Sequence, residues 1–247
     1  MDVSIVIPAY NEQGRIIPTL EKICSYFQSA GMSFEVIVVD DGSKDGTVRT
    51  VTQWQKNKLF SSPLRGEDEG GGEIVRIISH PVNMGKGAAV RTGVLAAKGN
   101  LILFSDADLS TPIEEFEKLR RVMDEGYDVA IGSRGLSESD VKIKQNLLRR
   151  MIGVAGSYMI KLMVIKRFAD TQCGFKMFSN EKGKLLFRRQ KIQGFAFDVE
   201  LLYRAVRRNY RIKEVPVVWM NSVVSRVDTV RDPLRVLRDL FRIRTGF

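Results

Sequence analysis

Two carboxylates one residue apart, Asp106 and Asp108, are the side chains whose types and spacing first point to chemistry. They follow the run 101–105, which is mostly apolar and therefore predicts a central strand buried on both faces. In an extended chain, side chains at i and i+2 point to the same side, so these two acids could share one hard divalent cation. Because Asp-x-Asp is a common sequence, a solvated turn is the alternative.

The elements that must position these acids alternate along the chain. Apolar and β-branched runs predict strands at 3–8, 34–39, 74–78, 101–105 and 127–132. Periodic patterns between them predict helices over 13–30, from about 48 to 55 and over 111–125. A further helix is predicted to follow the loop 80–89 and to end at about residue 97. This alternation predicts an α/β fold with a mostly parallel central sheet and flanking helices, whose ligands bind where the strands end.

Other strand ends carry chemically useful side chains too. The second strand runs into an acid-rich loop that contains Asp41, and the fifth delivers Arg134. After the third strand, Lys86 stands between two glycines, which lets the backbone approach a phosphate while the lysine supplies charge. The spacing differs from that of a Walker A loop.

Composition narrows the possible classes of protein. A chain of 247 residues fits one large α/β domain, alone or with a small appendage. One histidine and two cysteines argue against a His-based zinc site, a Ser-His-Asp triad and a disulfide framework, and favour a reducing compartment. We expect no signal peptide and no transmembrane segment, hence a cytoplasmic location.

Charge is divided unevenly between the two halves. Residues 1–133 hold 14 basic and 19 acidic residues, a net of −5, whereas residues 134–247 hold 25 and 10, a net of +15. The second half is therefore expected to meet an anionic partner, either nucleic acid, a membrane surface or a phosphorylated ligand. A basic face that serves only solubility is the alternative.

Two segments of the second half combine apolar and basic residues. The stretch 146–168 is Met-rich and framed by basic residues, which is typical of an interfacial helix or of a core helix. In 230–244, arginines flank a stripe formed by Leu234, Leu237, Leu240 and Phe241. A basic amphipathic helix favours an anionic membrane surface or a lipid phosphate, whereas nucleic acid is not expected because aromatic stacking platforms are not interleaved with the basic residues.

Several motifs together carry a resemblance to a known family. They are Ile7-Pro8-Ala9-Tyr10-Asn11-Glu12, the run 39–47 (VDDGSKDGT), the run 83–88 (NMGKGA), Asp106-Ala107-Asp108, and the runs 132–134, 170–176 and 195–202. In this order and spacing they resemble family 2 glycosyltransferases of the Rossmann-like GT-A fold, and among these the polyprenyl-phosphate sugar transferases, especially dolichyl-phosphate β-glucosyltransferases. The resemblance implies a GT-A catalytic domain over 1–225, with an interfacial helix at about 146–168, and a basic amphipathic tail over 226–247.

The resemblance also implies a donor site. Asp106 and Asp108 would hold Mg²⁺ or Mn²⁺ against the donor diphosphate, where Asp106 and Lys86 would also bind the nucleotide. The nucleoside pocket would be lined by Pro8, Tyr10, Glu12 and Asp41.

An acceptor site is implied in the second half of the chain. Arg134 and Arg226 would face the acceptor phosphate, with Thr171 and Gln172 in an acceptor loop. Asp198 would act as a base or orient the acceptor, although a structural role fits it equally well. Asp170, in the same stretch as Thr171, has the same two interpretations.

The implied reaction is an inverting transfer of a hexose, first of all glucose from UDP-glucose, to a polyprenyl or dolichyl phosphate on the cytoplasmic face of a membrane. The alternatives are a GDP-mannose-dependent mannose transfer, a soluble transferase acting on a glycan or glycolipid hydroxyl, and a non-catalytic protein that binds nucleotide sugars or tethers membranes. The sequence departs from many relatives in two ways: we expect no membrane-spanning helix, and 221–226 replaces a His and Gly-Ser-Lys pattern. No oligomeric state is predicted.

Overall fold

The computed structural model describes residues 1–61, 74–142, 159–220 and 231–246. Its main sheet consists of β1 (Val3–Ala9), β2 (Phe34–Asp40), β3 (Val75–Ser79), β4 (Leu101–Ser105), β5 (Val129–Ser133), β7 (Phe175–Ser179) and β8 (Ile212–Pro216). The short strands β6 (Asp140–Val141) and β9 (Val218–Trp219) pair separately. The helices are α1 (Ile16–Ser29), α2 (Thr47–Ser61), α3 (Lys86–Ala96), η1 (Ile113–Glu115), α4 (Phe116–Asp124), α6 (Asn180–Arg188), α7 (Phe197–Arg207) and α8 (Arg231–Thr245).

The sheet has the order β3-β2-β1-β4-β7-β5-β8 within the described ranges. β3, β2, β1 and β4 are parallel, β7 runs antiparallel to both of its neighbours, and β5 pairs in parallel with β8. The predicted α/β fold with a mostly parallel sheet and flanking helices is thus confirmed. The sequence did not predict β7, because Lys176 stands in its middle and breaks the apolar pattern that identifies a buried strand.

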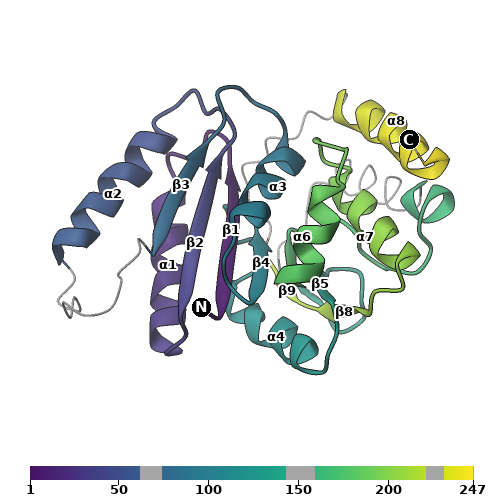
Figure 1. Cartoon of the computed structure of the whole chain (residues 1–247), viewed down its shortest axis with the longest axis horizontal. Helices are drawn as coiled ribbons and strands as arrows, with labels where there is room; N and C mark the ends of the chain where they lie inside the picture. The colour runs from purple at the N-terminus through teal and green to yellow at the C-terminus, as the bar shows by residue number, and fades with distance from the viewer. Residues whose placement is uncertain (62–73, 143–158, 221–230, 247) are drawn as a thin grey trace.

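Helices cover both faces of the sheet and bury an apolar core on each. One core joins the sheet to α1, α2 and α4, with the rings of Phe27 and Phe116 edge to face at 4.9 Å. The other joins it to α3, α6, α7 and α8, and includes the edge-to-face pair Phe104–Phe197. Figure 1 shows α2 beside β3 at one end of the molecule and α8 at the opposite end.

Part of the stretch 146–168 packs in the core. Residues 143–158 lie outside the described residues, but Ile160, Ile165 and Phe168 are buried in the same core as α7. Leu162 is 64% exposed. For residues 159–168, the core interpretation therefore fits better than an interfacial helix.

Helix α8 is docked on the domain, and the single stripe expected from the sequence is wrong. Leu240 and Ile243 are buried in the second core, whereas Leu237 and Phe241 are exposed. The reason is geometric: at about 100° per residue, positions 240 and 243 lie on the side of the helix that packs on the domain, while positions 237 and 241 are turned away from it. Leu234 has no described side chain, and the boundary predicted at 225/226 falls in 221–230, outside the described residues.

No helix in the described ranges is long and apolar enough to span a membrane.

Candidate active site

The acidic pair lies at the carboxyl end of β4, in a turn. Leu109 donates its backbone N–H to the carbonyl of Asp106 at 3.2 Å and has a positive φ of 46°. Asp108 Oδ1 accepts the N–H of Ser110 at 3.0 Å, which stabilises the turn. The expectation that the chain stays extended here is therefore wrong, because the turn begins as soon as the strand ends.

The charges of Asp106 and Asp108 nevertheless both affect one nearby side chain, the guanidinium of Arg15. The guanidinium of Arg15 has its pKa raised above the ordinary value, first by its hydrogen bond with Glu12 and also by the charges of Asp108 and Asp106. Asp106 keeps 32% of its side chain exposed. The two acids therefore create one region of negative potential that solvent and ligands can reach.

Lys86 supplies the nearest opposite charge to this turn. It is the first residue of α3, after Gly85 with a φ of 103°, and its Nζ lies 2.6 Å from Asp106 Oδ1. Burial disfavours the charged ammonium, but the carboxylates of Asp106 and Asp198 outweigh it, so the pKa of Lys86 is raised. The structure thus brings together two of the residues expected at the donor diphosphate.

Asp41 organises the loop that carries Lys86. Its carboxylate accepts backbone N–H groups from Met84 at 2.9 Å and Gly85 at 2.8 Å, and it pairs with Nδ1 of His80 at 2.8 Å. The sequence did not predict that Asp41 would be engaged in this way, since 40 residues separate it from the loop. Its expected contact with the nucleoside stays a prediction.

The other expected nucleoside residues lie at the end of β1 and just after it. Pro8 and Tyr10 are half-buried at its end, and Glu12 forms a paired contact with Arg15, whose Nη2 lies 2.7 Å from Glu12 Oε1. Arg15 was not predicted, although its position three residues after Glu12 at the start of a helix is a signal for such a pair. The carboxylate of Glu12 is thus held by Arg15, the residue that precedes α1.

Arg134 is held by Asp170 at the end of β5. Its Nε and Nη2 donate to the two oxygens of Asp170 at 2.6 and 3.0 Å, and its backbone N–H donates at 3.1 Å. Although burial alone would raise the pKa of Asp170, the guanidinium lowers it to about 2. Asp170 also accepts the N–H of Gln172 at 3.0 Å, so its geometry is that of an acid that orients Arg134.

This pair predicts a pH dependence of stability. The pKa of Asp170 is lower in the folded protein than its ordinary value of 3.8, so its stabilising effect is complete above pH 4 and disappears as the pH falls towards 2. A shift of this size corresponds to about 2 kcal/mol. We expect the difference in unfolding free energy between wild type and Asp170→Asn, measured by urea titration, to shrink between about pH 4 and pH 2. A constant difference would contradict this assignment.

The other acceptor residues are only partly placed. Thr171 is buried, Gln172 is half-buried, and Arg226 lies outside the described residues. Asp198 is buried in the first turn of α7, with Oδ1 at 2.7 Å from Nζ of Lys176. Burial raises the pKa of Asp198, and the ammonium groups of Lys176 and Lys86 oppose that shift without cancelling it.

Comparison with known proteins identifies the family. The family described as "Glycosyl transferase family 2" matches residues 4–195. The chain belongs to this family. It is therefore a glycosyltransferase, as the motifs indicated.

Named relatives match this glycosyltransferase over nearly its whole length. It is 35% identical to "Dolichyl-phosphate beta-glucosyltransferase ALG5C" of Trichomonas vaginalis, over 99% of this chain and 71% of the relative. It is 34% identical to the "Dolichyl-phosphate beta-glucosyltransferase" of Drosophila melanogaster, over 98% and 74%, and 31% identical to the human protein of that name, over 99% and 75%.

Solved structures show the same fold at lower identity. A glucosyl-3-phosphoglycerate synthase from Mycobacterium tuberculosis, crystallised with Mn²⁺, UDP-glucose and phosphoglyceric acid, matches 100% of this chain and 80% of its own, with a TM-score of 0.69 and 18% identity. At this identity the likeness establishes the fold of the glycosyltransferase and nothing about its ligands.

Two features of this glycosyltransferase were not predicted from its sequence. Lys176, whose side chain is only 2% exposed, pairs with Asp198 from the strand inserted between β4 and β5. Asp40 is buried at the end of β2, and its Oδ1 has no hydrogen-bond partner among the described residues. The available signals were a lysine among the apolar residues of 173–178 and the first acid of the Asp-Asp pair.

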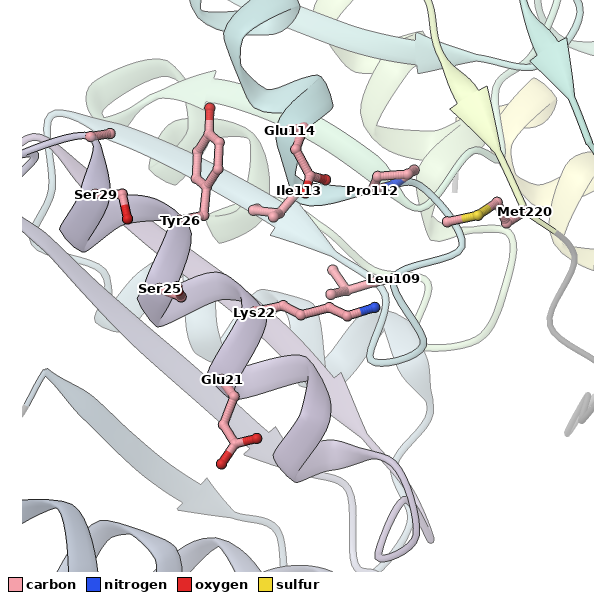
Figure 2. Close-up of a pocket in the computed structure, with 11 residues that line it drawn as sticks. Glu21, Lys22, Ser25, Tyr26, Ser29, Leu109, Pro112, Ile113, Glu114 and Met220 are labelled. Atoms are coloured by element: carbon pink, nitrogen blue, oxygen red, sulfur yellow. The ribbon is translucent and has the colours of Figure 1, made fainter.

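A pocket of this glycosyltransferase borders the acidic turn at Leu109, the neighbour of Asp108. It runs between α1 and residues 109–114, with Lys22 and Tyr26 on the helix side and Leu109 and Met220 opposite, as Figure 2 shows. None of the predicted site residues lines it.

Proposed function

We propose that this glycosyltransferase moves glucose from UDP-glucose to a polyprenyl or dolichyl phosphate, with inversion at the anomeric carbon. The observation that carries the choice of acceptor is the Asp198–Lys176 pair, because a buried carboxylate 2.7 Å from an ammonium is poorly placed to deprotonate a hydroxyl. A lipid monophosphate is already an anion near neutral pH and needs no such base. The names of the relatives, matched at 31–35% identity, support the same acceptor.

The donor would bind at the ends of β1, β2 and β4. Asp40 supports this placement, since its Oδ1 is a buried acceptor without a hydrogen-bond partner in the described part of the chain, suited to an N–H of the nucleobase. Lys86 would bind the diphosphate after leaving Asp106. Transfer of its ammonium from carboxylate to phosphate keeps the charge paired throughout.

The acidic turn fits a divalent cation. Its donor set is all oxygen, which suits Mg²⁺ or Mn²⁺, and Asp106 already holds a cation, the ammonium of Lys86, at 2.6 Å. Within the described ranges no cluster of three or more metal-binding side chains exists, so Asp106 and Asp108 would leave coordination positions for the donor phosphates and water. A bound cation would neutralise the charge that develops on the leaving nucleoside diphosphate.

The acceptor phosphate would meet Arg134. Asp170 engages Nε and Nη2 of its guanidinium, and no hydrogen bond within the described part of the chain uses Nη1. Arginine binds phosphate with a planar set of donors, so this remaining nitrogen can hold a phosphate oxygen in line with the donor sugar. Arg134 would thereby bind and orient the nucleophile.

Asp198→Asn separates a phosphate acceptor from a hydroxyl acceptor. We expect the variant to keep kcat within about tenfold of wild type, since general base catalysis is worth about 10²–10⁴-fold and would be absent here. Stability should fall by about 3 kcal/mol, because Lys176 loses its buried partner. Initial rates per folded enzyme and a urea titration measure both effects. Loss of activity in fully folded enzyme would favour a hydroxyl acceptor.

The direct test of the proposed function is a transfer assay. The protein is incubated with radiolabelled UDP-glucose, GDP-mannose or UDP-N-acetylglucosamine, with dolichyl phosphate in detergent and with Mn²⁺ or Mg²⁺, and lipid products are separated from free sugar. We expect a glucolipid from UDP-glucose, with no product in EDTA. Mannolipid from GDP-mannose would correct the donor, and absence of glycolipid from every donor would refute the proposal.

We also propose that α8 rests on an anionic membrane surface, where a lipid acceptor would be found. Its outer face presents Leu237 and Phe241, the latter 62% exposed, and the exposed side chains of Arg238 and Arg242 lie on the same helix. Apolar residues flanked by arginines are the pattern of helices that lie in a membrane interface. The docked face of α8 would keep the helix beside the active domain.

The α8 proposal predicts the effect of changing only the outer face. Leu237→Ser combined with Phe241→Ser should weaken binding to vesicles of phosphatidylcholine and phosphatidylserine by about tenfold or more, since each side chain contributes about 1–2 kcal/mol on burial. Cosedimentation measures this binding. Ile74→Ser is the matched control, because Ile74 is an exposed apolar residue just before β3, at the other end of the sheet. Equal binding by all three proteins would contradict the proposal.

A further inference from the structure

Arg134 and Trp219 leave the sheet from neighbouring strands. β5 and β8 are parallel, and their last pair is Ser133 with Pro216. Arg134 follows Ser133 directly, and Trp219 lies in β9, three residues after Pro216. Both side chains therefore emerge at the edge of the sheet where the site lies.

The guanidinium of Arg134 is held from two sides. Asp170 binds its Nε and Nη2, while its Cζ lies 5.5 Å from the centroid of the Trp219 ring. This distance is within the range of a cation–π interaction, which restrains a guanidinium without using any of its donors. Asp170 thus holds one edge of the group, and the ring of Trp219 lies against it.

The segment that carries Trp219 also reaches the acidic turn. Met220 donates its backbone N–H to the carbonyl of Ser110 at 2.7 Å, and the N–H of Ser110 is bonded to Asp108 Oδ1. On its other side, β9 pairs with β6, where Lys142 donates its N–H to the carbonyl of Trp219 at 3.0 Å. Residues 219–220 therefore contact the turn of Asp108 through the Met220–Ser110 backbone hydrogen bond, and Arg134 through the ring of Trp219.

We propose that Trp219 is a positioning residue for Arg134. Its ring holds the guanidinium at a fixed place relative to the turn of Asp108, so that Nη1 meets the acceptor phosphate in line with the donor. This inference rests on the proposed function, in which Arg134 binds that phosphate. It adds a residue to which neither the sequence motifs nor the relatives gave a role.

Steady-state kinetics test the inference. Trp219→Leu removes the ring face and should raise the KM for dolichyl phosphate about five- to tenfold, with the KM for UDP-glucose changed less than twofold. Trp219→Phe keeps an aromatic face and should recover most of the affinity for the acceptor. An equal rise of both KM values, or no recovery with phenylalanine, would overturn the inference.

A double-mutant cycle distinguishes positioning from general packing. In the Arg134→Ala background, Trp219→Leu should cause no further loss, because the group that it positions is absent. Thermal unfolding midpoints of all four proteins show whether each variant is folded. The same loss in both backgrounds would mean that Trp219 acts without Arg134 and would refute the inference.

Fluorescence gives a readout that does not depend on sugar transfer. In a Trp54→Phe background, Trp219 is the remaining tryptophan of the chain, and dolichyl phosphate in detergent should change its emission when Arg134 is present and leave it unchanged in Arg134→Ala. Dolichol in the same detergent is the control. If no sugar is transferred but dolichyl phosphate still changes the emission of Trp219, the proposed function fails and the positioning role stands. If sugar is transferred normally but the effects of the two substitutions in the double-mutant cycle simply add, the positioning role alone is refuted.

Discussion

Asp108→Asn should lower kcat by about 10³-fold, since a metal ion that neutralises the leaving diphosphate supplies several kcal/mol of transition-state stabilisation. The substitution is conservative for the fold: asparagine retains the Oδ1 that accepts the N–H of Ser110 at 3.0 Å, so the turn should persist. The variant changes the charge of the carboxylate and little else. The loss should therefore fall on metal binding and catalysis, with the thermal midpoint nearly unchanged.

Two measurements check this expectation. Mn²⁺ titration by electron paramagnetic resonance, with UDP present, should show weaker binding to Asp108→Asn, and the initial rate at saturating Mn²⁺ should stay low. Asp124→Asn is the matched control, because Asp124 is an exposed acid at the end of α4 whose ion pair with Arg120, at 3.6 Å, lies on the surface. A wild-type rate in Asp108→Asn would remove the acidic turn from the mechanism.

Gly174→Ala should reduce kcat/KM by about 10²-fold through a single added methyl group, because a displacement of about 1 Å in a catalytic group has effects of this size. A Cβ at position 174 would lie 1.9 Å from Oδ2 and 2.3 Å from Cγ of Asp106. The carboxylate of Asp106 would have to rotate away, which would break its contact with Lys86. The site would lose both a proposed metal ligand and the partner that holds Lys86.

The chain offers a matched control for this substitution. Gly194 has no atom within 4 Å of an added Cβ and no positive φ, so Gly194→Ala should keep wild-type activity. Kinetics for both variants, with Mn²⁺ titration for Gly174→Ala, measure the difference. Similar activity in the two variants would show that Asp106 tolerates displacement, which would weaken the assignment of Asp106 as a metal ligand.

The sequence alone determined the fold class and the places of several loops that carry the candidate site. Strand and helix periods are local signals, so the first four strands and their loops could be predicted, and with them the shared edge at which Lys86 meets Asp106. The motifs at those strand ends also identified the family, because the spacing of loops along alternating strands is itself visible in the sequence.

Only the tertiary structure decided what lies between and around those loops. β7 inserts antiparallel between β4 and β5 and brings Lys176 to Asp198, a pairing across 22 residues that no local pattern signals. The face of α8 that docks on the domain, and the turn that replaces an extended chain at Asp106, likewise depend on packing partners distant in sequence. Residue types and spacings specify which groups are available, whereas burial and long-range contacts decide which of them are already paired.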